Sequence, residues 1–203
     1  VRSLTTQTDA LDAKSWTEVQ TFHDEQGDRV GKITEYDNGI VKTEEWDNGN
    51  RTTIQQTDTL NVRNWDSIET FYGSDGVIAG RSTTMDNGIE RTEVFDDNGQ
   101  RMISSSVDTN DELSWSTQDN FYLPTGVLVQ RNTQMDNGDR FVFLNQEDCV
   151  RDFRVEVDGD ASNDWAYRVT DYDADGLNPV VTTYDTLEDM PEPYIDSLGM
   201  VTP

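Results

Sequence analysis

The sequence predicts an all-β fold of four tandem four-stranded antiparallel meander repeats, arranged as an extended or shell-like array. Three observations predict it. The sequence has a period of about 50 residues. Glycine-containing turn sequences stand at fixed places within each period. Threonine, valine, isoleucine, tyrosine and tryptophan, which favour pleated strands, fill the stretches between these turns.

Tryptophan and glycine carry the period most clearly. Trp16, Trp65, Trp115 and Trp165 follow one another at intervals of 49, 50 and 50 residues. The same spacing recurs at Phe22, Phe71 and Phe121, and at Gly27, Gly76, Gly126 and Gly176. We therefore divide the chain into the last strand of a preceding repeat (1–14), repeat 1 (15–63), repeat 2 (64–113), repeat 3 (114–163) and a degenerate C-terminal repeat or cap (164–203).

Each repeat contains four predicted strands, which we call A to D. In repeat 1, strand A runs from Trp16 to Phe22, and the stretches "RVGKITEY", "IVKTEEW" and "RTTIQQT" form strands B, C and D. "DNG" turns separate B from C and C from D, because Asn-Gly tolerates the positive φ angles that tight hairpins need. No stretch has a sustained helical period. In the fourth copy, "YIDSLGM" from Tyr194 is a degenerate echo of the second turn.

Charged residues lie in the middle of the predicted strands. Alternation places Glu18, Lys32 and Glu44 on one face, so that Lys32 would lie between acidic groups on both sides. Repeat 2 would repeat this with Glu69, Arg81, Arg91 and Glu93. Opposed charges contribute roughly 0.2–1 kcal/mol per pair, which suits a sheet whose centre stays wet. A dry core would hold these charges at a much greater cost in free energy.

This charge pattern favours the open array, and a closed four-bladed propeller is the alternative. The propeller has one argument of its own: residues 1–14 supply a strand D, which the fourth copy lacks. A propeller closes its last blade with such a strand.

The stretch "TEYDNGIVKTEEWDNGNR" resembles the tyrosine-aspartate tandem repeats of large acidic bacterial secreted or surface proteins. These include YD/Rhs-like repeats and the repeats that accompany RTX segments. The likeness recurs at Tyr36-Asp37, Met85-Asp86, Met135-Asp136 and Tyr184-Asp185. It implies secretion, exposure at the cell surface and a scaffold or adhesive role. Glycine-rich RTX nonapeptides are absent from the sequence, so the calcium-driven folding of RTX proteins does not carry over.

The composition restricts the partners. A net charge of −26 repels nucleic acid and anionic membranes, so we expect neither nucleic-acid binding nor membrane insertion. We expect an extracellular or cell-surface location, with other copies, other repeats or surface polysaccharide as partners. The chain begins at Val1, which suggests a piece of a longer protein. Cys149 is the single cysteine and His23 the single histidine, which excludes an internal disulfide and a His-pair zinc site.

The strongest predicted metal site is a calcium site at Asp171, Asp173 and Asp175 in "DYDADG". Alternating aspartates on a tight turn can bring hard oxygen ligands together, and glycine permits the bend. Thr182 stands where an EF-hand would have its last acidic ligand, so Asp185 or a backbone carbonyl would have to help. The alternative is an ordinary turn between strands A and B.

A second predicted metal site lies in "DGDASND", where Asp158, Asp160, Ser162 and Asp164 alternate with other residues. The alternative is an acidic solvated loop between strands D and A.

The function expected from the sequence is a non-enzymatic structural or adhesive module that calcium stabilises. A carbohydrate-binding module with exposed aromatic side chains is the alternative. A polysaccharide-active enzyme domain is a third possibility, but no carboxylate pair stands out from the repetitive background. Exposure of Trp16, Trp65 and Trp115 separates the first two, because packing at repeat junctions would bury them and sugar binding would expose them.

Overall fold

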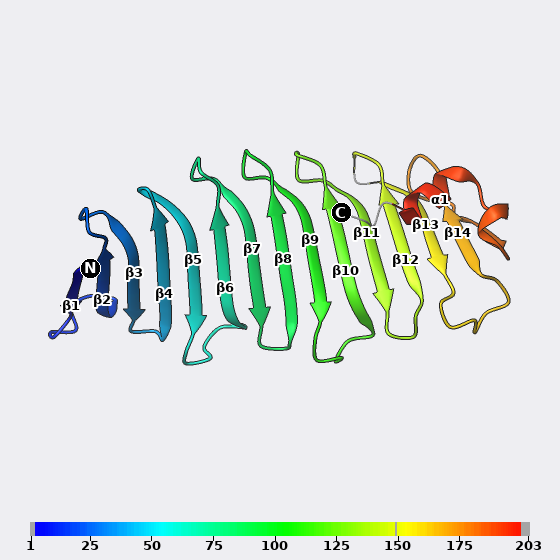
Figure 1. The fold of residues 1–203 in the computed structure, drawn as a ribbon. Coiled ribbons are helices and arrows are strands. Elements are labelled where there is room, and N and C mark those ends of the chain that lie inside the picture. The colour runs from blue at the N-terminus through cyan, green and yellow to red at the C-terminus, as the bar shows by residue number, and fades with distance from the viewer. Residues whose placement is uncertain (1–2, 149, 200–203) are drawn as a thin grey trace. The chain divides into compact units, whose positions relative to one another are not determined.

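The computed structural model describes residues 3–148 and 150–199, so Cys149 lies outside the described residues. The described residues form fifteen β-strands, a 3-10 helix and one α-helix (Figure 1). Two compact units divide the chain, residues 1–100 and residues 101–203. The all-β fold class predicted from the sequence is confirmed.

The first unit contains β1 (Ser3–Thr8), β2 (Trp16–His23), β3 (Arg29–Tyr36), β4 (Ile40–Asp47), β5 (Asn50–Asp58), β6 (Trp65–Tyr72), β7 (Ile78–Met85) and β8 (Ile89–Phe95). The second contains β9 (Arg101–Asp108), β10 (Trp115–Tyr122), β11 (Leu128–Met135), β12 (Arg140–Asn145), β13 (Arg151–Val157), β14 (Tyr167–Asp171), β15 (Val180–Tyr184), the 3-10 helix η1 (Leu187–Asp189) and α1 (Glu192–Gly199).

Within each unit the strands pair antiparallel with their neighbours in sequence, as the alternating arrows in Figure 1 show. The meander predicted for repeat 1 corresponds to β2, β3, β4 and β5, which pair in that order. Each unit is therefore an open antiparallel sheet, as the predicted array requires.

The closed propeller is wrong. In a propeller, the N-terminal strand would complete the blade of the fourth copy. Instead, β1 pairs with β2 from Ser3↔His23 to Thr8↔Glu18. All residues of β1 are exposed, as expected for a strand at a sheet edge. The open sheet is the arrangement that the mid-strand charges favoured, although Glu44 in the middle of β4 is itself buried.

The "DNG" turns form as predicted. In the β3–β4 turn, the Gly39 N–H donates to the Tyr36 carbonyl at 3.0 Å, and φ of Gly39 is 80°. The Asn38 side chain accepts the N–H of Ile40 at 3.2 Å. The same side-chain contact recurs at Asn87 and Asn137. Asparagine and glycine together therefore account for the tight reversal.

The predicted register of strand A was wrong. Lys32 lies opposite Glu44 on one side, as expected, but opposite Thr21 on the other. Glu18 instead lies opposite Glu35, and in repeat 2 Glu69 lies opposite Ser82. Register shifts at each end of these strand pairs insert an extra residue, which moves strand A to the other face.

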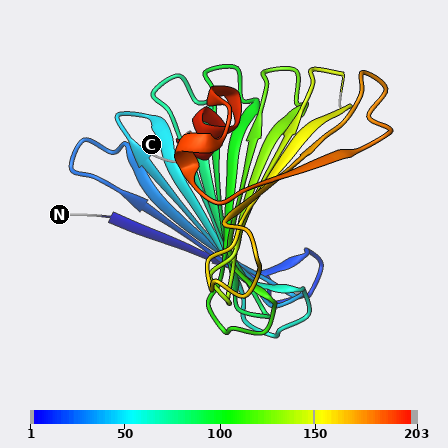
Figure 2. The same ribbon diagram turned by 90° about the vertical axis from the view of Figure 1, so that its right-hand side faces the viewer.

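A dry core forms in the second unit, where α1 covers three valines. Val142, Val155 and Val169 lie opposite one another on β12, β13 and β14, and each is fully buried. Met190 and partly buried side chains of α1, including Ile195, pack against them. Figure 2 shows α1 standing on one side of the strands. In the first unit the corresponding row is polar, with Thr43, Gln55 and Glu69 in register.

Helix α1 corrects the expectation of a turn at "YIDSLGM". Pro191 precedes the helix, and its carbonyl accepts the N–H of Tyr194 at 3.1 Å. Phe153 meets the Tyr194 ring edge-on at 5.0 Å. The helix has 8 residues, which is too short for a helical period to stand out from the repeat pattern.

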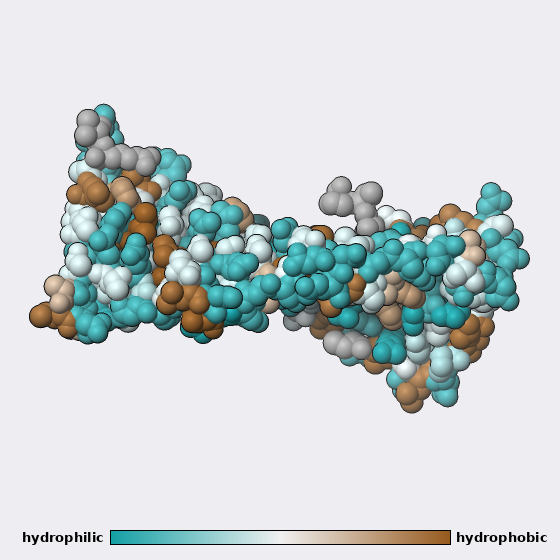
Figure 3. Space-filling view, turned by 90° about the horizontal axis from the view of Figure 1, so that it is seen from below, coloured by the Kyte–Doolittle hydropathy of each residue, from teal (hydrophilic) through white to brown (hydrophobic). Residues whose placement is uncertain are grey.

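The part of the surface that Figure 3 shows is mainly hydrophilic. Figure 3 shows small, separate hydrophobic patches on the edge at the foot of Figure 1. Exposed apolar side chains in the β1–β2 and β5–β6 loops include Leu11, Leu60 and Val62. Single exposed apolar residues of this kind are ordinary on soluble domains.

Candidate functional site

The predicted calcium residues Asp171, Asp173 and Asp175 are not brought together as a set of converging ligands. Asp171 ends β14, and one of its carboxylate oxygens accepts the Tyr194 hydroxyl at 2.7 Å. Asp173 accepts the backbone N–H groups of Asp175 at 3.2 Å and Leu177 at 2.8 Å. Its second oxygen accepts the Asn178 amide at 2.6 Å. Calcium at these three residues remains a prediction.

Asp173 occupies a turn position that recurs elsewhere in the chain. Asp24 accepts the N–H groups of the residues two and four positions later, at 2.9 and 2.8 Å. Asp96 does the same at 2.9 and 2.8 Å. The side-chain hydrogen bond from Asn178 and the backbone hydrogen bond from Leu177 lower the pKa of Asp173. An aspartate three residues before a turn glycine was the sequence signal for this structural role.

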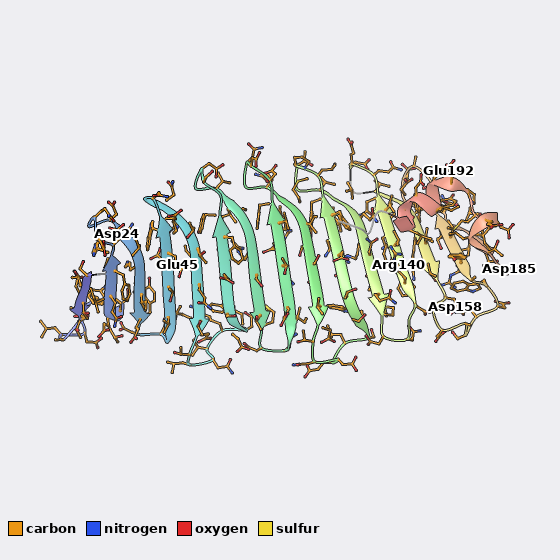
Figure 4. The ribbon with its side chains drawn as sticks, viewed as in Figure 1. Asp24, Glu45, Arg140, Asp158, Asp185 and Glu192 are labelled. Atoms are coloured by element: carbon orange, nitrogen blue, oxygen red, sulfur yellow. The ribbon has the colours of Figure 1, made fainter. Side chains whose placement is uncertain are left out.

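One group of three carboxylates stands out among the described residues. Oxygen atoms of Asp139, Asp158 and Asp160 all lie within 4.8 Å of one another. Asp139 follows the turn between β11 and β12, and the other two belong to the β13–β14 loop. Figure 4 labels Asp158 near the end of β13, where this loop begins. This group contains two residues of the second predicted metal site and one that the sequence analysis missed.

Two glycines allow these loops to approach. A Cβ on Gly159 would overlap the backbone of Gly138. The Gly159 N–H donates to Asp139 at 3.0 Å, which joins the turn to the loop. Asn137 donates to Asp139 at 2.9 Å and more weakly to Asp160 at 3.5 Å. The sequence signal was the replacement of Ile40 and Ile89, which follow the earlier "DNG" turns, by aspartate.

Asp158 also has a structural role that recurs in every copy. Its carboxylate accepts the N–H of the residue five positions later, Asn163, at 2.8 Å. Asp9, Asp58 and Asp108 make the same contact at 2.5, 2.6 and 2.6 Å. The hydrogen bond from Asn163 is the main reason that the pKa of Asp158 is lowered. The same aspartate thus closes the D–A loop in each copy.

The remaining residues of the second predicted site divide between two places. The Ser162 N–H donates to Asp158 at 3.3 Å and to Asp160 at 2.9 Å, so Ser162 closes the loop through its backbone. Asp164 instead lines a hollow of about 360 Å³ together with Trp165 and Asp185.

The Asp139–Asp158–Asp160 group offers hard oxygen ligands of the kind that calcium prefers.

Buried glutamates in the middle of the strands are paired with lysine and arginine side chains. Glu44 is 6% exposed and meets Lys42 at 3.0 Å, Arg51 at 3.2 Å and Lys32 at 4.0 Å. In the second unit Glu156 is 3% exposed and pairs with Arg154 and Arg168. Buried carboxylates need such partners to remain ionised.

Arginines also stack on aromatic rings with the repeat period. The Arg51–Tyr72, Arg101–Tyr122 and Arg151–Tyr172 pairs have guanidinium-to-ring distances of 4.6, 4.4 and 5.7 Å. His23 occupies the corresponding place at the end of β2. Each stack joins the start of strand D to the end of the next strand A, and it favours a structural role for the aromatic column.

The tryptophans that open the repeats, Trp16, Trp65 and Trp115, are half-buried. Their exposure lies between the burial expected for packing at repeat junctions and the full exposure expected for sugar binding. Two other tryptophans have a ring face covered by arginine: Arg29 lies 3.9 Å from the centre of Trp46, and Arg168 lies 4.8 Å from that of Trp165.

Comparison with models of known protein families gives no match, and neither does comparison with curated proteins. In the part of the chain that the structure describes, no helix has both the length and the apolar character needed to cross a bilayer.

Proposed function

We propose that the chain is a non-enzymatic structural or adhesive repeat module of a secreted or cell-surface bacterial protein. The observation that carries this proposal is the use of charged and aromatic side chains within the sheets. Glu44 and Glu156 are enclosed by cations, and arginines occupy aromatic faces in successive repeats. Groups that could bind or activate a substrate are thus engaged in holding neighbouring strands together.

The repetition of these contacts supports a scaffold. A repeat array is stabilised by each unit's contacts with its neighbours, so it can extend without a single large core. The paired charges keep an open sheet soluble, and the net charge of −26 opposes aggregation. Its partners in this role are other copies, other repeats or surface polysaccharide. Calcium bound by loop carboxylates would stiffen the array.

A carbohydrate-binding module is the second candidate, favoured by a hollow in the first unit. This hollow of about 510 Å³ is lined by Phe22, Lys32, Glu44 and Trp46 among others. Aromatic rings beside polar groups suit sugar binding. However, Arg29 already stacks on Trp46, and Glu44 is held by three cations. Retardation of the chain in polysaccharide gels, abolished by Trp46→Ala, would favour this candidate.

Pulling the chain by its two ends in a single-molecule force experiment tests the scaffold role. We expect successive unfolding steps, because each strand pairs with its neighbours in sequence and can be peeled from them. A repeat of about 50 residues would release roughly 170 Å of chain. The part covered by α1 should yield last, because its valines form a dry core. A single all-or-none event would contradict a modular scaffold.

A further inference from the structure

Asp58 and Asp108 each have a buried carboxylate oxygen with no hydrogen-bond partner. They end β5 and β9 at equivalent places in repeats 1 and 2, and they are 8% and 9% exposed. In each, Oδ2 accepts the backbone N–H that closes the D–A loop, at 2.6 Å. The Oδ1 atoms are buried and have no partner among the described residues. A buried carboxyl oxygen in this state favours a ligand that replaces the lost water.

Each of the two aspartates has further carboxylates in its neighbourhood. Partial loss of solvent raises the pKa of Asp86, and the negative charges of Asp66 and Asp58 raise it further. In the second unit, Asp136 has its pKa raised in the same way, with Asp111 and Asp108 as the charged neighbours. Two equivalent positions thus combine a buried unpartnered oxygen with two further carboxylates.

The backbone holds these carboxylates next to the loop. The Asp86 N–H donates to the Asn64 carbonyl at 3.4 Å, which ties the β7–β8 turn to the loop that Asp58 closes. The Asp136 N–H makes the equivalent contact with Ser114 at 3.3 Å. Four of these carboxylates are exposed at the surface, in contrast to the buried Asp58 and Asp108: they belong to Asp66, Asp86, Asp111 and Asp136. They can therefore change rotamer without disturbing the sheet.

The equivalent aspartates of the preceding strand D and of repeat 3, Asp9 and Asp158, differ in this respect. Asp9 makes the same loop contact but is only half-buried. In repeat 3, Oδ1 of Asp158 accepts the Ser162 N–H at 3.3 Å, so both of its oxygens have partners. The unpartnered oxygen is thus particular to Asp58 and Asp108, and it does not follow from loop closure alone.

We propose that Asp58 and Asp108 each anchor a calcium ion, with Asp66 and Asp86 as further ligands in the first unit and Asp111 and Asp136 in the second. The buried oxygen is the fixed ligand, and the exposed carboxylates close on the ion. Carboxylate oxygens of Asp139, Asp158 and Asp160 already lie within 4.8 Å of one another. Among the described residues, the carboxylates proposed here as ligands in the first and second units are not yet gathered so closely. Calcium suits sites that assemble in this way, because it accepts irregular sets of six to eight oxygens, whereas magnesium demands a near-octahedral set. This inference is independent of the scaffold role.

Equilibrium dialysis of the whole chain against calcium, after treatment with EDTA, tests the proposal. We expect Asp58→Asn and Asp108→Asn each to reduce the number of bound calcium ions by one per chain. Asp9→Asn is the matched control, because it alters the same loop contact without an unpartnered buried oxygen, and it should bind as many ions as the unaltered chain. Ions held by other loops are common to all four proteins and do not affect the comparison.

Thermal unfolding provides a second measurement. Asparagine retains an oxygen for the loop N–H, so the variants should fold. In EDTA, Asp58→Asn should melt at or above the temperature of the unaltered chain, because it removes a buried charge from an acidic cluster. In calcium the order should reverse, since the unaltered chain gains a bound ion there. The proposal would be overturned if all variants bound the same number of calcium ions, or if calcium did not reverse the order of the melting temperatures. Either result would mean that water or a proton satisfies the buried Oδ1 atoms of Asp58 and Asp108.

Discussion

Replacing Val155 by aspartate should unfold the helix-covered part of the second unit. Val155 is fully buried between Val142 and Val169, and Met190, at 3% exposure, packs against the same cluster. Aspartate would place an unpaired charge in this dry core, at a cost of more than about 4 kcal/mol in the free energy of unfolding. Because a domain is commonly stable by only about 5–15 kcal/mol, circular dichroism and urea unfolding should show a large loss.

Gln55→Asp is the matched control for this substitution. Gln55 occupies the corresponding position of strand D in repeat 1, where the residue is exposed and lies opposite Glu69. A new carboxylate opposite Glu69 adds repulsion of at most about 1 kcal/mol. Equal losses at Val155 and Gln55 would contradict a dry core confined to the region beneath α1.

Glu44→Gln should destabilise the first unit by about 2–3 kcal/mol, because it removes the charge that three cations share. Lys32, Lys42 and Arg51 would remain on adjacent strands with no buried carboxylate between them. Their partial exposure limits the loss to less than that of a fully buried pair. Glu45→Gln is the control, because Glu45 is the neighbouring residue of β4 and is exposed (Figure 4). Chemical unfolding at pH 7 should show a clear loss for Glu44→Gln and a small one for Glu45→Gln.

The effect of Glu44→Gln should depend on pH. Burial tends to raise the pKa of Glu44, but hydrogen bonds from Lys42 and Arg51 and the charges of Lys42 and Lys32 together lower it below 4.5. A carboxyl whose pKa is lowered on folding stabilises the protein above its unfolded pKa. This contribution is lost as the pH falls from about 4.5 through the folded pKa. The difference in stability between the unaltered chain and Glu44→Gln should shrink over that range, and a constant difference would contradict the ion-pair account.

The strands and turns could be predicted from the sequence because they depend on local signals. Asn38-Gly39 supplies a donor-acceptor pair and a positive φ, so the turn follows from two residues. The register of strand A could not be predicted in the same way. The pairing of strand A with strand B has an extra residue in strand A near Trp16 and another in strand B opposite His23, and alternation alone cannot locate such bulges.

The candidate metal sites show what local sequence patterns leave open. "DYDADG" suggested converging ligands, yet Asp171 contacts Tyr194 of α1 and Asp173 closes its own turn. The group that does converge includes Asp139, from a turn that comes before Asp158 in the chain. Only the pairing of β12 with β13 brings the turn and the loop to the same edge. Such groups depend on tertiary structure rather than on residue spacing.

Amide hydrogen exchange of β1, measured by NMR at low protein concentration, tests the open-sheet account most directly. β1 pairs with β2 on one side, so alternate amides of Ser3–Thr8 should face solvent and exchange rapidly. The amides of β2, which pairs with β1 and β3, should be protected throughout. Slow exchange of every amide in both β1 and β15 of the monomeric chain would show that these strands have partners on both sides, as in a closed propeller, and would contradict the account.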